Sequence, residues 1–521
     1  MITVWHEMLE TQARVRADSP ALSYKSQTLS YAELWGLASQ VGSALAGLGV
    51  AREDRVAVFL EKRPETVAAF LGASVAGGAF VPINPLLKPP QVAHILSDCA
   101  ARVLVTSAAR LELLRDVLDG CPELEQVVVV DGPVATPADV ATHDWAELLA
   151  DAPASVPAPG VDLDVAAILY TSGSTGLPKG VVLSHRNLVV GAQSVSQYLG
   201  NTAEDVILSV LPLSFDAGLS QVTTALNVGA HVVLLNYLLP ADVPRACDRW
   251  KVTGLTCVPP LWIQIADLDW PEGARATLRY FANTGGRMPR TVLDRLREVF
   301  PGASPYLMYG LTEAFRSTYL DPSEVDRRPD SIGKAIPNAE ILVVRPDGTP
   351  CEPGEPGELV HRGALVSLGY WGAPERTAER FRPVPGPTSG HRLPEVAVWS
   401  GDTVVKDEEG FLYFVGRADE MIKTSGYRVS PNEIEQAALD SRLAADAVAF
   451  GVEDARLGQR VVLVAAPPAG DGALDPDALL TALRAALPAF MVPAEVVVRE
   501  AIPRSPNGKY DRTRVRAEYE S

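Results

Sequence analysis

The stretch Tyr170-Thr171-Ser172-Gly173-Ser174-Thr175-Gly176-Leu177-Pro178-Lys179-Gly180 directly follows an apolar run, residues 165–169, that is typical of a buried strand. Its closely spaced backbone N–H groups, hydroxyl donors and single mobile cation can meet the concentrated charge of a polyphosphate. The glycines let the backbone approach the phosphates, where a Cβ would obstruct it. A flexible surface loop is the alternative, but it explains neither the preceding strand nor the closing Lys179. The stretch also lacks the Gly-Lys-Ser/Thr ending of the common P-loop.

Strand-like and helix-like segments alternate on both sides of this stretch. Apolar runs typical of buried strands occupy residues 56–60, 79–83, 103–105, 126–130, 205–211 and 231–235. Residues 65–76 and 91–97 have the pattern of helices. Strands separated by helices indicate βαβ units and mainly parallel sheets, so the predicted fold class is α/β.

The length of 521 residues exceeds what one hydrophobic core supports, which predicts two or more domains. Towards the C-terminus, short apolar segments at 448–452, 461–466 and 495–499 accompany an Ala/Leu-rich helix at 476–487, which indicates a small α+β unit. We place the boundary in the charged stretch Gly416-Arg417-Ala418-Asp419, giving a large domain over 1–418 and a small domain over 419–521. The Ala/Pro-rich segment 151–159 is expected to be an exposed connection.

Bulk properties exclude several classes of function. The formal net charge of −18 argues against general binding to nucleic acid or to anionic membranes. Five scattered cysteines without a Cys-x-x-Cys pair suit a reducing cytosol better than a disulfide framework. Residues 1–10 lack the pattern of a signal peptide, and no apolar run is long enough to span a bilayer. We therefore expect a soluble, cytoplasmic protein.

The stretch 170–180 resembles the signature loop of the AMP-forming adenylating superfamily, and the resemblance extends over nearly the whole chain. That superfamily holds acyl-CoA synthetases, amino-acid adenylation enzymes and luciferases. The resemblance implies a large N-terminal domain of mixed, mainly parallel sheets with helices, and a small mobile α+β C-terminal domain. It also implies an enzyme that uses ATP and Mg²⁺ to convert a carboxylic acid into acyl-AMP and pyrophosphate. The loop residues that would bind the phosphates are Thr171, Ser172, Gly173, Ser174, Thr175, Gly176 and Lys179.

The segment 283–289 is a second nucleotide motif. It follows a short apolar run, and its paired glycines allow close approach of a ligand. By the resemblance, Gly285, Gly286 and Arg287 lie against the adenine, although an ordinary turn also fits these residues when they are taken alone.

Tyr309-Gly310-Leu311-Thr312-Glu313 is more specific. Tyr309 can cover a purine face, Thr312 can bond a phosphate, and Glu313 can hold Mg²⁺, which prefers carboxylate and phosphate oxygens. By the resemblance, Gly310 and Leu311 belong to the same nucleotide site. The alternative for Glu313 is a carboxylate at a helix N-terminus.

Asp402 and Arg417 match the positions that bind the ribose hydroxyls in the superfamily. A carboxylate accepts two hydroxyl hydrogen bonds readily, whereas the alternative is a surface ion pair of little energetic effect. Asp419 matches the hinge about which the small domain rotates between adenylation and transfer, and Gly426 would line the passage for the acceptor thiol. A capped helix beginning at Ser430-Pro431-Asn432-Glu433 is compatible with that role.

The segment 503–509 contains Pro and Asn-Gly, which indicate a tight turn with Lys509 at its tip. By the resemblance, Lys509 reaches the α-phosphate and the attacking carboxylate, although a lysine near a terminus is usually just solvated. Both reactants are anions, so cations must screen them. We therefore expect Thr171, Lys179, Glu313 and Lys509 to act in catalysis.

Phe215-Asp216 is the main clue to the acid. Amino-acid-adenylating members of the superfamily carry Phe-Asp at this point, and the Asp pairs with the α-ammonium group of the substrate. A buried ammonium needs a carboxylate partner, but Asp216 is also well suited to cap a helix. By the resemblance, Arg316 falls on a segment lining the acyl pocket, where it either binds a substrate carboxylate or forms a structural ion pair. Thr284 and Met308 are expected to line the same pocket.

Two longer strings, 81–88 and 327–334, resemble the acyl-CoA ligase subgroup associated with bacterial exosortase systems, and also stand-alone ligases that load acyl carrier proteins. The expected partners are a small carboxylic or amino acid and either CoA or an acyl carrier protein, with no nucleic acid and no membrane span. Three alternatives remain: a fatty or aromatic acyl-CoA synthetase, an amide-forming enzyme with an amine acceptor, and a non-catalytic adenylate-binding regulator. The last is disfavoured because Glu313 and Lys509 are both present.

Overall fold

The computed structural model describes residues 2–132, 140–152, 160–171, 177–386, 395–417, 421–468, 474–503, 510 and 512–520. Several predicted site residues lie outside this part of the chain, namely 172–176, Asp419 and Lys509, together with the side chain of Arg417. Most of the predicted connection at 151–159 and the predicted domain boundary after residue 418 lie outside it as well.

A seven-stranded sheet carries the two described ends of the stretch 170–180, which is predicted to bind phosphates and which we call the phosphate-binding stretch. In spatial order it consists of β7 (Ala141–Asp144), β6 (Gln126–Val129), β5 (Val103–Thr106), β3 (Arg55–Phe59), β4 (Ala79–Pro82), β8 (Val165–Thr171) and β9 (Lys179–Ser184). Neighbouring strands are parallel except β8 and β9, which pair antiparallel on either side of residues 172–178. The central strands are buried along almost their whole length, which explains why their sequences are continuous apolar runs.

A fourteen-stranded sheet supplies most of the loops around the candidate site. Its first half consists of β2 (Gln27–Ser30), β1 (Pro20–Tyr24), β11 (His231–Leu234), β10 (Val206–Ser209), β12 (Gly254–Cys257), β13 (Tyr280–Asn283) and β14 (Ser304–Tyr309), which are parallel apart from the edge strand β2. Parallel strands end at the same edge of a sheet. The segments that follow β10, β12, β13 and β14 therefore converge there, where ligands of α/β proteins bind.

Beyond β14 the same sheet is antiparallel. Its second half consists of β15 (Thr318–Leu320), β16 (Ser331–Ala335), β21 (Leu412–Arg417), β20 (Val396–Lys406), β18 (Pro356–Gly363) and β17 (Ala339–Val344), with β19 (Phe381–Pro383) on β20. The segment 310–317 lies where the sheet changes from parallel to antiparallel. The predicted α/β class with mixed sheets is thus observed.

The largest apolar core contains side chains from both sheets and from helices α2 (Tyr31–Gly47), α3 (Pro64–Val75), α7 (His185–Leu199) and α8 (Asp216–Val228). α7 and α8 are buried on almost every face, which explains why α8 in particular lacks a charged stripe. The remaining helices of the large part are α1 (His6–Val15), α4 (Pro89–Asp98), α5 (Ala108–Leu114), α6 (Trp145–Ala150), α9 (Asp242–Trp250), α10 (Pro259–Ile265), α11 (Glu272–Thr277), α12 (Arg290–Val299) and α13 (Pro374–Arg380).

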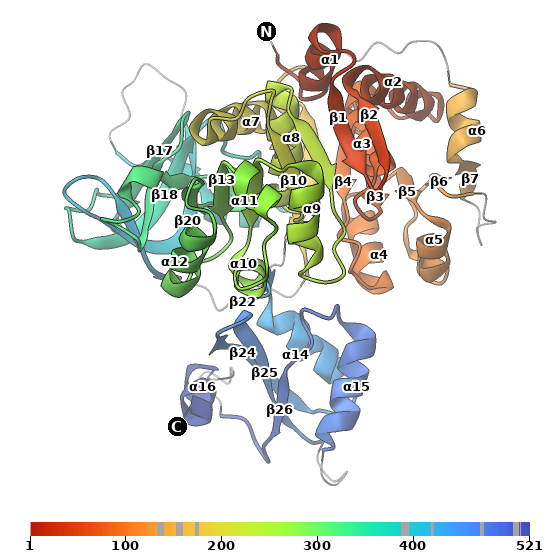
Figure 1. The fold of residues 1–521 in the computed structure, drawn as a ribbon. Coiled ribbons are helices and arrows are strands. Elements are labelled where there is room, and N and C mark those ends of the chain that lie inside the picture. Colours follow the sequence, from red (N-terminus) through yellow and green to blue (C-terminus); the bar gives the residue numbers. More distant parts are fainter. Residues whose placement is uncertain are drawn as a thin grey trace.

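The C-terminal unit has its own sheet and its own apolar core. The sheet contains β22 (Ile422–Thr424), β23 (Tyr427–Val429), β24 (Asp446–Asp454), β25 (Gly458–Ala466) and β26 (Glu495–Val498), and the helices are α14 (Pro431–Asp440), α15 (Pro476–Ala486) and α16 (Arg512–Glu520). Figure 1 shows this unit below the large part, with α4 and α10 on the facing side. α14 begins after Ser430 as expected, but the predicted cap is wrong. The Ser430 hydroxyl forms no capping hydrogen bond, and Glu433 bonds to Gln91 instead.

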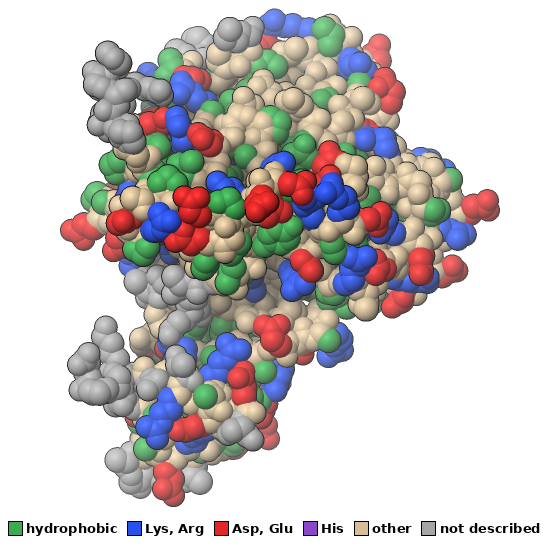
Figure 2. Space-filling view, turned by 90° about the vertical axis from the view of Figure 1, so that its left-hand side faces the viewer, with side chains coloured by type: hydrophobic (Ala, Val, Ile, Leu, Met, Phe, Trp, Pro, Cys, Tyr) green, Lys and Arg blue, Asp and Glu red, His purple; other side chains and the backbone are tan. Residues whose placement is uncertain are grey.

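Acidic and basic side chains are interspersed on the face drawn in Figure 2, and a constriction separates the large part from the smaller C-terminal unit. On this face the acidic groups do not gather into a single patch. Among the residues that the structure describes, no helix combines the length and the apolar character needed to cross a bilayer.

Candidate active site

Lys179, near the end of the phosphate-binding stretch, meets Glu313 and Tyr370. Lys179 begins β9, Glu313 lies in a short 3-10 turn after β14, and Tyr370 lies in the loop after β18. The Lys179 Nζ atom lies 3.1 Å from Glu313 Oε1 and 2.6 Å from the Tyr370 hydroxyl oxygen, and that hydroxyl donates to Glu313 Oε1 at 2.7 Å. Three segments that are far apart in the sequence thus hold one cation and one anion side by side.

Glu313 is buried and yet ionised. Burial by itself would raise the pKa of its carboxyl, but the charges of Lys179 and Arg428 and the hydrogen bond from Tyr370 outweigh burial and lower the pKa to about 2. An ionised carboxylate suits Mg²⁺, which takes one or two carboxylates and completes its shell with phosphate and water oxygens. The Glu313 carboxylate therefore fits the role of a magnesium ligand.

Thr171 ends β8, at the start of the phosphate-binding stretch. Its hydroxyl is buried and has no hydrogen-bond partner among the residues that the structure describes. A buried hydroxyl without a partner is unfavourable, so the Thr171 hydroxyl is a candidate donor to a ligand.

A strained turn directs Arg316 into the interior. Phe315 has φ 57° and ψ −55°, and the Arg316 N–H donates to the Ala314 carbonyl at 2.6 Å, which is the hydrogen bond of a γ-turn. Such backbone is unfavourable for a bulky residue. The fully buried Phe315 ring packs so closely on Gly191 that a Cβ there would lie 2.6 Å from it, and this packing stabilises the turn. The turn at Phe315 lies between Glu313 and Arg316, and both of these side chains line the same cavity.

That cavity, of about 650 Å³, also contains Asp216 and Thr284, and we call it the acid pocket. Arg316 is buried, and its Nη1 donates to Thr284 Oγ1 at 3.1 Å and lies 3.8 Å from Asp216 Oδ2. The Arg316 Nε has no hydrogen-bond partner among the described residues. The structure thus brings together three of the residues predicted to bind the acid, with Asp216 and Arg316 slightly too far apart for a direct hydrogen bond.

Asp216 is not the cap of its helix. The cap position is Phe215, and Asp216 is the first residue of α8, where its Oδ1 accepts the N–H of Ala217 at 2.7 Å. Burial raises the pKa of the Asp216 carboxyl, although Arg316 opposes this shift. A second cation beside the carboxylate would favour its charged form, and an ammonium group of a ligand would supply one.

Lys62 and Gln221 hold the loop that carries Asp216. Lys62 is buried, and its Nζ donates to the carbonyls of Val210 and Leu211 at 2.7 and 3.2 Å. Gln221 Oε1 accepts the Leu211 N–H at 3.3 Å. Burial lowers the pKa of the Lys62 ammonium to about 7. These bonds fix the direction in which the chain enters α8.

A second cavity, of about 940 Å³, contains most of the residues predicted to bind the nucleotide base, and we call it the nucleotide cavity. Of the predicted residues, its lining includes Gly285, Gly286, Arg287, Met308, Tyr309 and Gly310. Met308, expected in the acid pocket, is thus found here, whereas Leu311 and Thr312 line the acid pocket beside Glu313.

Arg287 is largely exposed and pairs with Asp330 at 2.5 Å. The Tyr309 hydroxyl donates to the buried Asp402 at 2.5 Å, so the predicted adenine and ribose residues are contiguous.

The hairpin between β22 and β23 brings the C-terminal unit to both cavities. Gly426, in this hairpin, lines both of them. Its φ is +82°, and a Cβ there would lie 2.7 Å from the side chain of Val258. The adjacent Tyr427 ring contacts Phe215 edge-on, with the ring centroids 5.2 Å apart, and stacks on Phe490.

Helix α4 contacts both described ends of the phosphate-binding stretch. His94 Nε2 lies 3.0 Å from the Pro178 carbonyl oxygen, directly before Lys179. The Tyr170 hydroxyl donates to the Asp98 carboxylate. One helix therefore holds the chain on either side of residues 172–176.

Sequence analysis does not identify Tyr370 or Lys62. Lys62 carries a usable signal, because it follows the apolar run 56–60 and so stands at the carboxyl end of a parallel strand. Tyr370 carries none, because its loop reaches the site through contacts with segments distant in the sequence, such as the isolated bridge between Tyr370 and Val181 on β9. Arg428, which lowers the pKa of Glu313, lies a few residues beyond the expected hinge and has no predicted role.

Comparison with known proteins is consistent with this geometry. Residues 9–371 match the model of the AMP-binding enzyme family, and residues 433–509 match its C-terminal domain. One of the linear gramicidin synthase proteins of Brevibacillus parabrevis is 33% identical over 517 residues, which are 97% of this chain but 9% of that protein. Indoleacetate–CoA ligase of Aromatoleum aromaticum is 31% identical over 518 residues, 98% of this chain and 97% of that protein. The chain thus spans less than a tenth of the first relative and nearly all of the second.

Two solved structures extend the comparison. A double mutant of o-succinylbenzoate CoA synthetase from Bacillus subtilis, bound with a product analogue, superposes with a TM-score of 0.84 at 26% identity and covers 98% of this chain and 97% of that one. VinN in complex with L-aspartate has a TM-score of 0.67 at 32% identity over 79% of this chain and 98% of its own. These matches confirm the superfamily resemblance and the fold class predicted from the sequence. The chain therefore belongs to the AMP-binding enzyme family.

Proposed function

We propose that the protein is an ATP-dependent, AMP-forming ligase that adenylates an amino acid carrying a second carboxylate and transfers the acyl group to a phosphopantetheine thiol. The acceptor would be an acyl carrier protein or CoA. The observation that carries the substrate assignment is that Asp216 and Arg316 lie side by side in the cavity that also contains Glu313.

The buried pair offers one anionic and one cationic contact to the acid. Asp216 and Arg316 are 3.8 Å apart, and the Arg316 Nε has no partner among the described residues. A buried charge is unfavourable unless an opposite charge and hydrogen bonds meet it. An amino acid with two carboxylates satisfies both groups, because its ammonium binds Asp216, one carboxylate binds Arg316, and the other is left for adenylation.

The comparisons support an acid of this class. VinN, 32% identical to this chain, has a structure with L-aspartate, which carries one ammonium and two carboxylates. Indoleacetate, named in another relative, has a single carboxylate and no ammonium. An acid of that kind would leave Asp216 with Arg316 as its only cationic neighbour among the described residues.

Adenylation begins when a carboxylate oxygen of the acid attacks the α-phosphorus of ATP and the bond to pyrophosphate breaks. Both reactants are anions, so positioning and charge screening supply most of the catalysis. Lys179 would contact the outer phosphates, Lys509 the transferring one, and the Thr171 hydroxyl would donate to a phosphate oxygen. The Tyr370 hydroxyl bonds to both Lys179 and Glu313 and keeps them in place. Glu313 would hold Mg²⁺, which supplies positive charge to the phosphate oxygens when it is bound.

Transfer follows when the thiol sulfur attacks the carbonyl carbon of the acyl-adenylate, AMP leaves, and the thiol proton passes to solvent. Gly426 supports a passage for the thiol, because it lines both cavities and has no side chain to obstruct them. Asp419 is the proposed hinge for the rotation between the two steps, and Asp402 and Arg417 are the proposed ribose ligands. An amine in place of the thiol would give an amide by the same step.

Exchange of labelled pyrophosphate into ATP tests the assignment across amino acids, dicarboxylic acids, and aromatic and fatty acids. We expect aspartate-like amino acids to support the fastest exchange. Succinate, which lacks the ammonium, and alanine, which lacks the second carboxylate, should be slower by roughly 10²-fold, because each leaves a buried charge without a partner. If a fatty or aromatic acid exceeds every amino acid, the substrate assignment is wrong and the enzyme is an ordinary acyl-CoA synthetase. CoA, phosphopantetheine-bearing carrier proteins and amines are then compared as acceptors of the best acid.

A further inference from the structure

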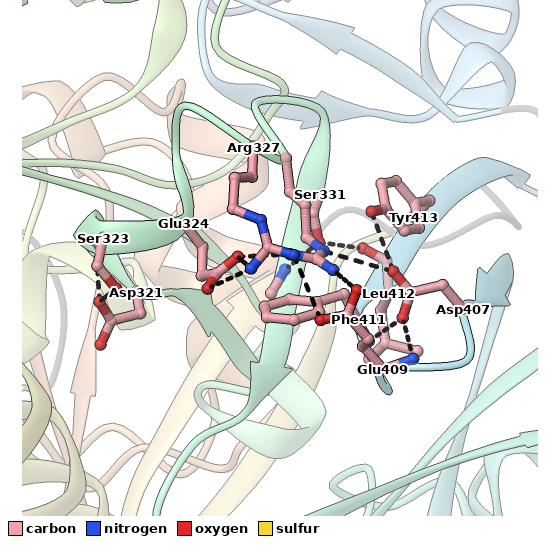
Figure 3. Close-up of polar contacts among 12 residues, drawn as sticks. Asp321, Ser323, Glu324, Arg327, Ser331, Asp407, Glu409, Phe411, Leu412 and Tyr413 are labelled. Atoms are coloured by element: carbon pink, nitrogen blue, oxygen red, sulfur yellow. Dashed lines mark hydrogen bonds and ion pairs between the residues drawn. The ribbon is translucent and has the colours of Figure 1, made fainter.

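A buried arginine lies behind the nucleotide cavity, in the stretch 327–334, which has no part in the proposed chemistry. Arg328 is 8% exposed and forms ion pairs with Glu324 at 2.5 Å, with Asp407 at 3.5 Å and with Glu409. Its guanidinium carbon lies 4.1 Å from the centroid of the Phe411 ring. Figure 3 shows Glu324 on one side, Asp407 and Glu409 on the other, and the Phe411 ring between them. We call these residues the Arg328 cluster.

The cluster joins two segments whose backbone pairing is short. β16 and β21 are paired at Ser331–Tyr413 and Gly333–Leu412, with an irregularity between the two pairs. The Ser331 hydroxyl adds one hydrogen bond, to the Leu412 carbonyl at 2.8 Å. So short a ladder contributes little attachment, and side chains add to it. They act through the charge-assisted bonds and the cation–π contact of the Arg328 cluster, the Arg327–Glu409 ion pair at 3.6 Å, and Lys334, whose Nζ lies 4.2 Å from the centroid of the Phe411 ring.

Both joined segments form one wall of the nucleotide cavity. The residues concerned are Pro329, Asp330, Ser331 and Ile332 from the first segment and Tyr413, Phe414 and Val415 from the second. Further along, β21 pairs with β20 at Asp402, whose carboxylate accepts the Tyr309 hydroxyl. The position of β21 therefore affects both the width of the cavity and the proposed ribose contact.

We propose that Arg328 is a positioning residue for the nucleotide, which it serves by holding β21 against β16. This inference rests on the proposed placement of ATP in the nucleotide cavity. Without the Arg328 guanidinium, Arg327 would still pair with Glu324 at 3.4 Å and with Glu409 at 3.6 Å, but Asp407 would lose its ion pair. The excess negative charge of the three carboxylates would then weaken the attachment of the two segments. No residue of the cluster lines the acid pocket, so binding of the acid should not change.

The test is Arg328→Met, which keeps an apolar contact on Phe411 and removes the charge. We expect the KM for ATP to rise roughly tenfold in pyrophosphate exchange, while the KM for the acid stays within about twofold of the native value. Arg328→Lys restores a charge without the planar fork, so it should recover only part of the loss. The double variant Arg328→Met, Glu409→Gln should lie closer to native than Arg328→Met, because one excess negative charge is gone. Arg345→Met is the matched control, since Arg345 pairs with Glu355 at 2.5 Å away from both cavities.

Each outcome decides the inference. An unchanged KM for ATP, or equal rises in the KM values for ATP and for the acid, overturns it. If Arg328→Met does not fold, the same comparison is made on the double variant, whose KM for ATP should still exceed the native value, and the same two results overturn the inference. Tyr309→Ala separates this inference from the proposed function. If Tyr309→Ala raises the KM for ATP and the Arg328 variants do not, only the inference fails. If Tyr309→Ala also has no effect, the nucleotide cavity is wrongly assigned and the inference falls with it.

Discussion

A buried carboxyl in the active site and a half-buried one where the C-terminal unit meets the large part have pKa values that move in opposite directions. Glu313 is surrounded by Lys179, Arg428 and Tyr370, which lower its pKa to about 2 against the effect of burial. Glu433 accepts a hydrogen bond from Gln91 at 2.5 Å, and burial raises its pKa to about 7 with only Gln91 opposing the shift. The first carboxyl is fixed in its charged form, whereas the second changes charge near neutral pH.

The difference follows from how the two regions are built. The charged groups of the site lie on segments that follow buried strands, and their neighbours hold them in place. The contact with the C-terminal unit depends on single side chains, such as Gln91 on Glu433 and Tyr427 on Phe215. We therefore expect changes in the site to affect adenylation itself, and changes at the contact to affect mainly the transfer step.

Glu313→Gln should have the largest effect. It removes the anion that pairs with Lys179 and the carboxylate proposed to hold Mg²⁺, so kcat for pyrophosphate exchange should fall by roughly 10²–10³-fold. Glu355→Gln, in a half-buried pair with Arg345 away from both cavities, is the control and should leave the rate unchanged. A native exchange rate in Glu313→Gln would remove Glu313 from the proposed site.

Asp216→Asn should lower kcat/KM for the preferred amino acid by about 10²-fold, because the ammonium and Arg316 lose the negative charge between them. The rate with the corresponding acid that lacks the amino group should change far less, and this difference distinguishes recognition from unfolding. Asp242→Asn is matched in position, since Asp242 is the first residue of α9, and it should have no effect. Equal losses with both acids would mean that Asp216 does not bind the ammonium.

Gly426→Ala should affect the contact rather than the site. Its φ of +82° is unfavourable for alanine, and the new Cβ would approach Val258 to 2.7 Å, so transfer to the acceptor should slow by about tenfold. Pyrophosphate exchange should stay close to native. Gly354→Ala has a similar φ of +84° with nothing within 4 Å, so it controls for backbone strain alone. The comparison between the two regions fails if Gly426→Ala slows both half-reactions by the same factor.

Glu433→Gln should have the smallest effect, visible in the pH profile. When the C-terminal unit is docked on the large part through Glu433 and Gln91, Glu433 holds its proton up to about pH 7. When the unit is undocked, Glu433 would release its proton near its ordinary pKa of 4.5. Between pH 4.5 and about 7, docking therefore takes up a proton, so it is favoured at the acidic end of this range and weakens as the pH rises towards 7. The ratio of transfer to adenylation in the native enzyme should fall by about threefold across that window, a small change because Glu433 is only partly buried.

Glutamine does not titrate, so Glu433→Gln should make this ratio independent of pH. Glu435→Gln is the control, because burial also raises the Glu435 pKa to about 7 but its partners, Arg512 and Ala449, lie within the C-terminal unit. The same pH dependence in Glu433→Gln as in the native enzyme would exclude Glu433 as its source.

Much of the fold was predictable because its signals are local. The buried strands β3, β4, β5 and β6 and the helices α3 and α4 lie within two residues of the ranges expected from apolar runs and periodicity. The capping expected at Ser430 was wrong, because a contact with another part of the molecule, Glu433 on Gln91, replaced the local hydrogen bond. The placement of Met308 also differed from expectation, because alternate residues of a strand face opposite sides of a sheet and the sequence does not say which side meets which cavity.

The class of chemistry could be inferred from local motifs, since a Ser/Thr/Gly stretch ending in Lys179, the motif ending in Glu313 and the pair Phe215-Asp216 are each recognisable within a few residues. Three pairings became visible only in the folded molecule: Asp216 with Arg316 in one cavity, Tyr370 with both Lys179 and Glu313, and Arg328 with the segment before β21. The two kinds of information differ in their range along the chain. Backbone conformation and apolar periodicity are set by near neighbours, whereas the pairing of charges depends on strands that are distant in sequence and adjacent in space.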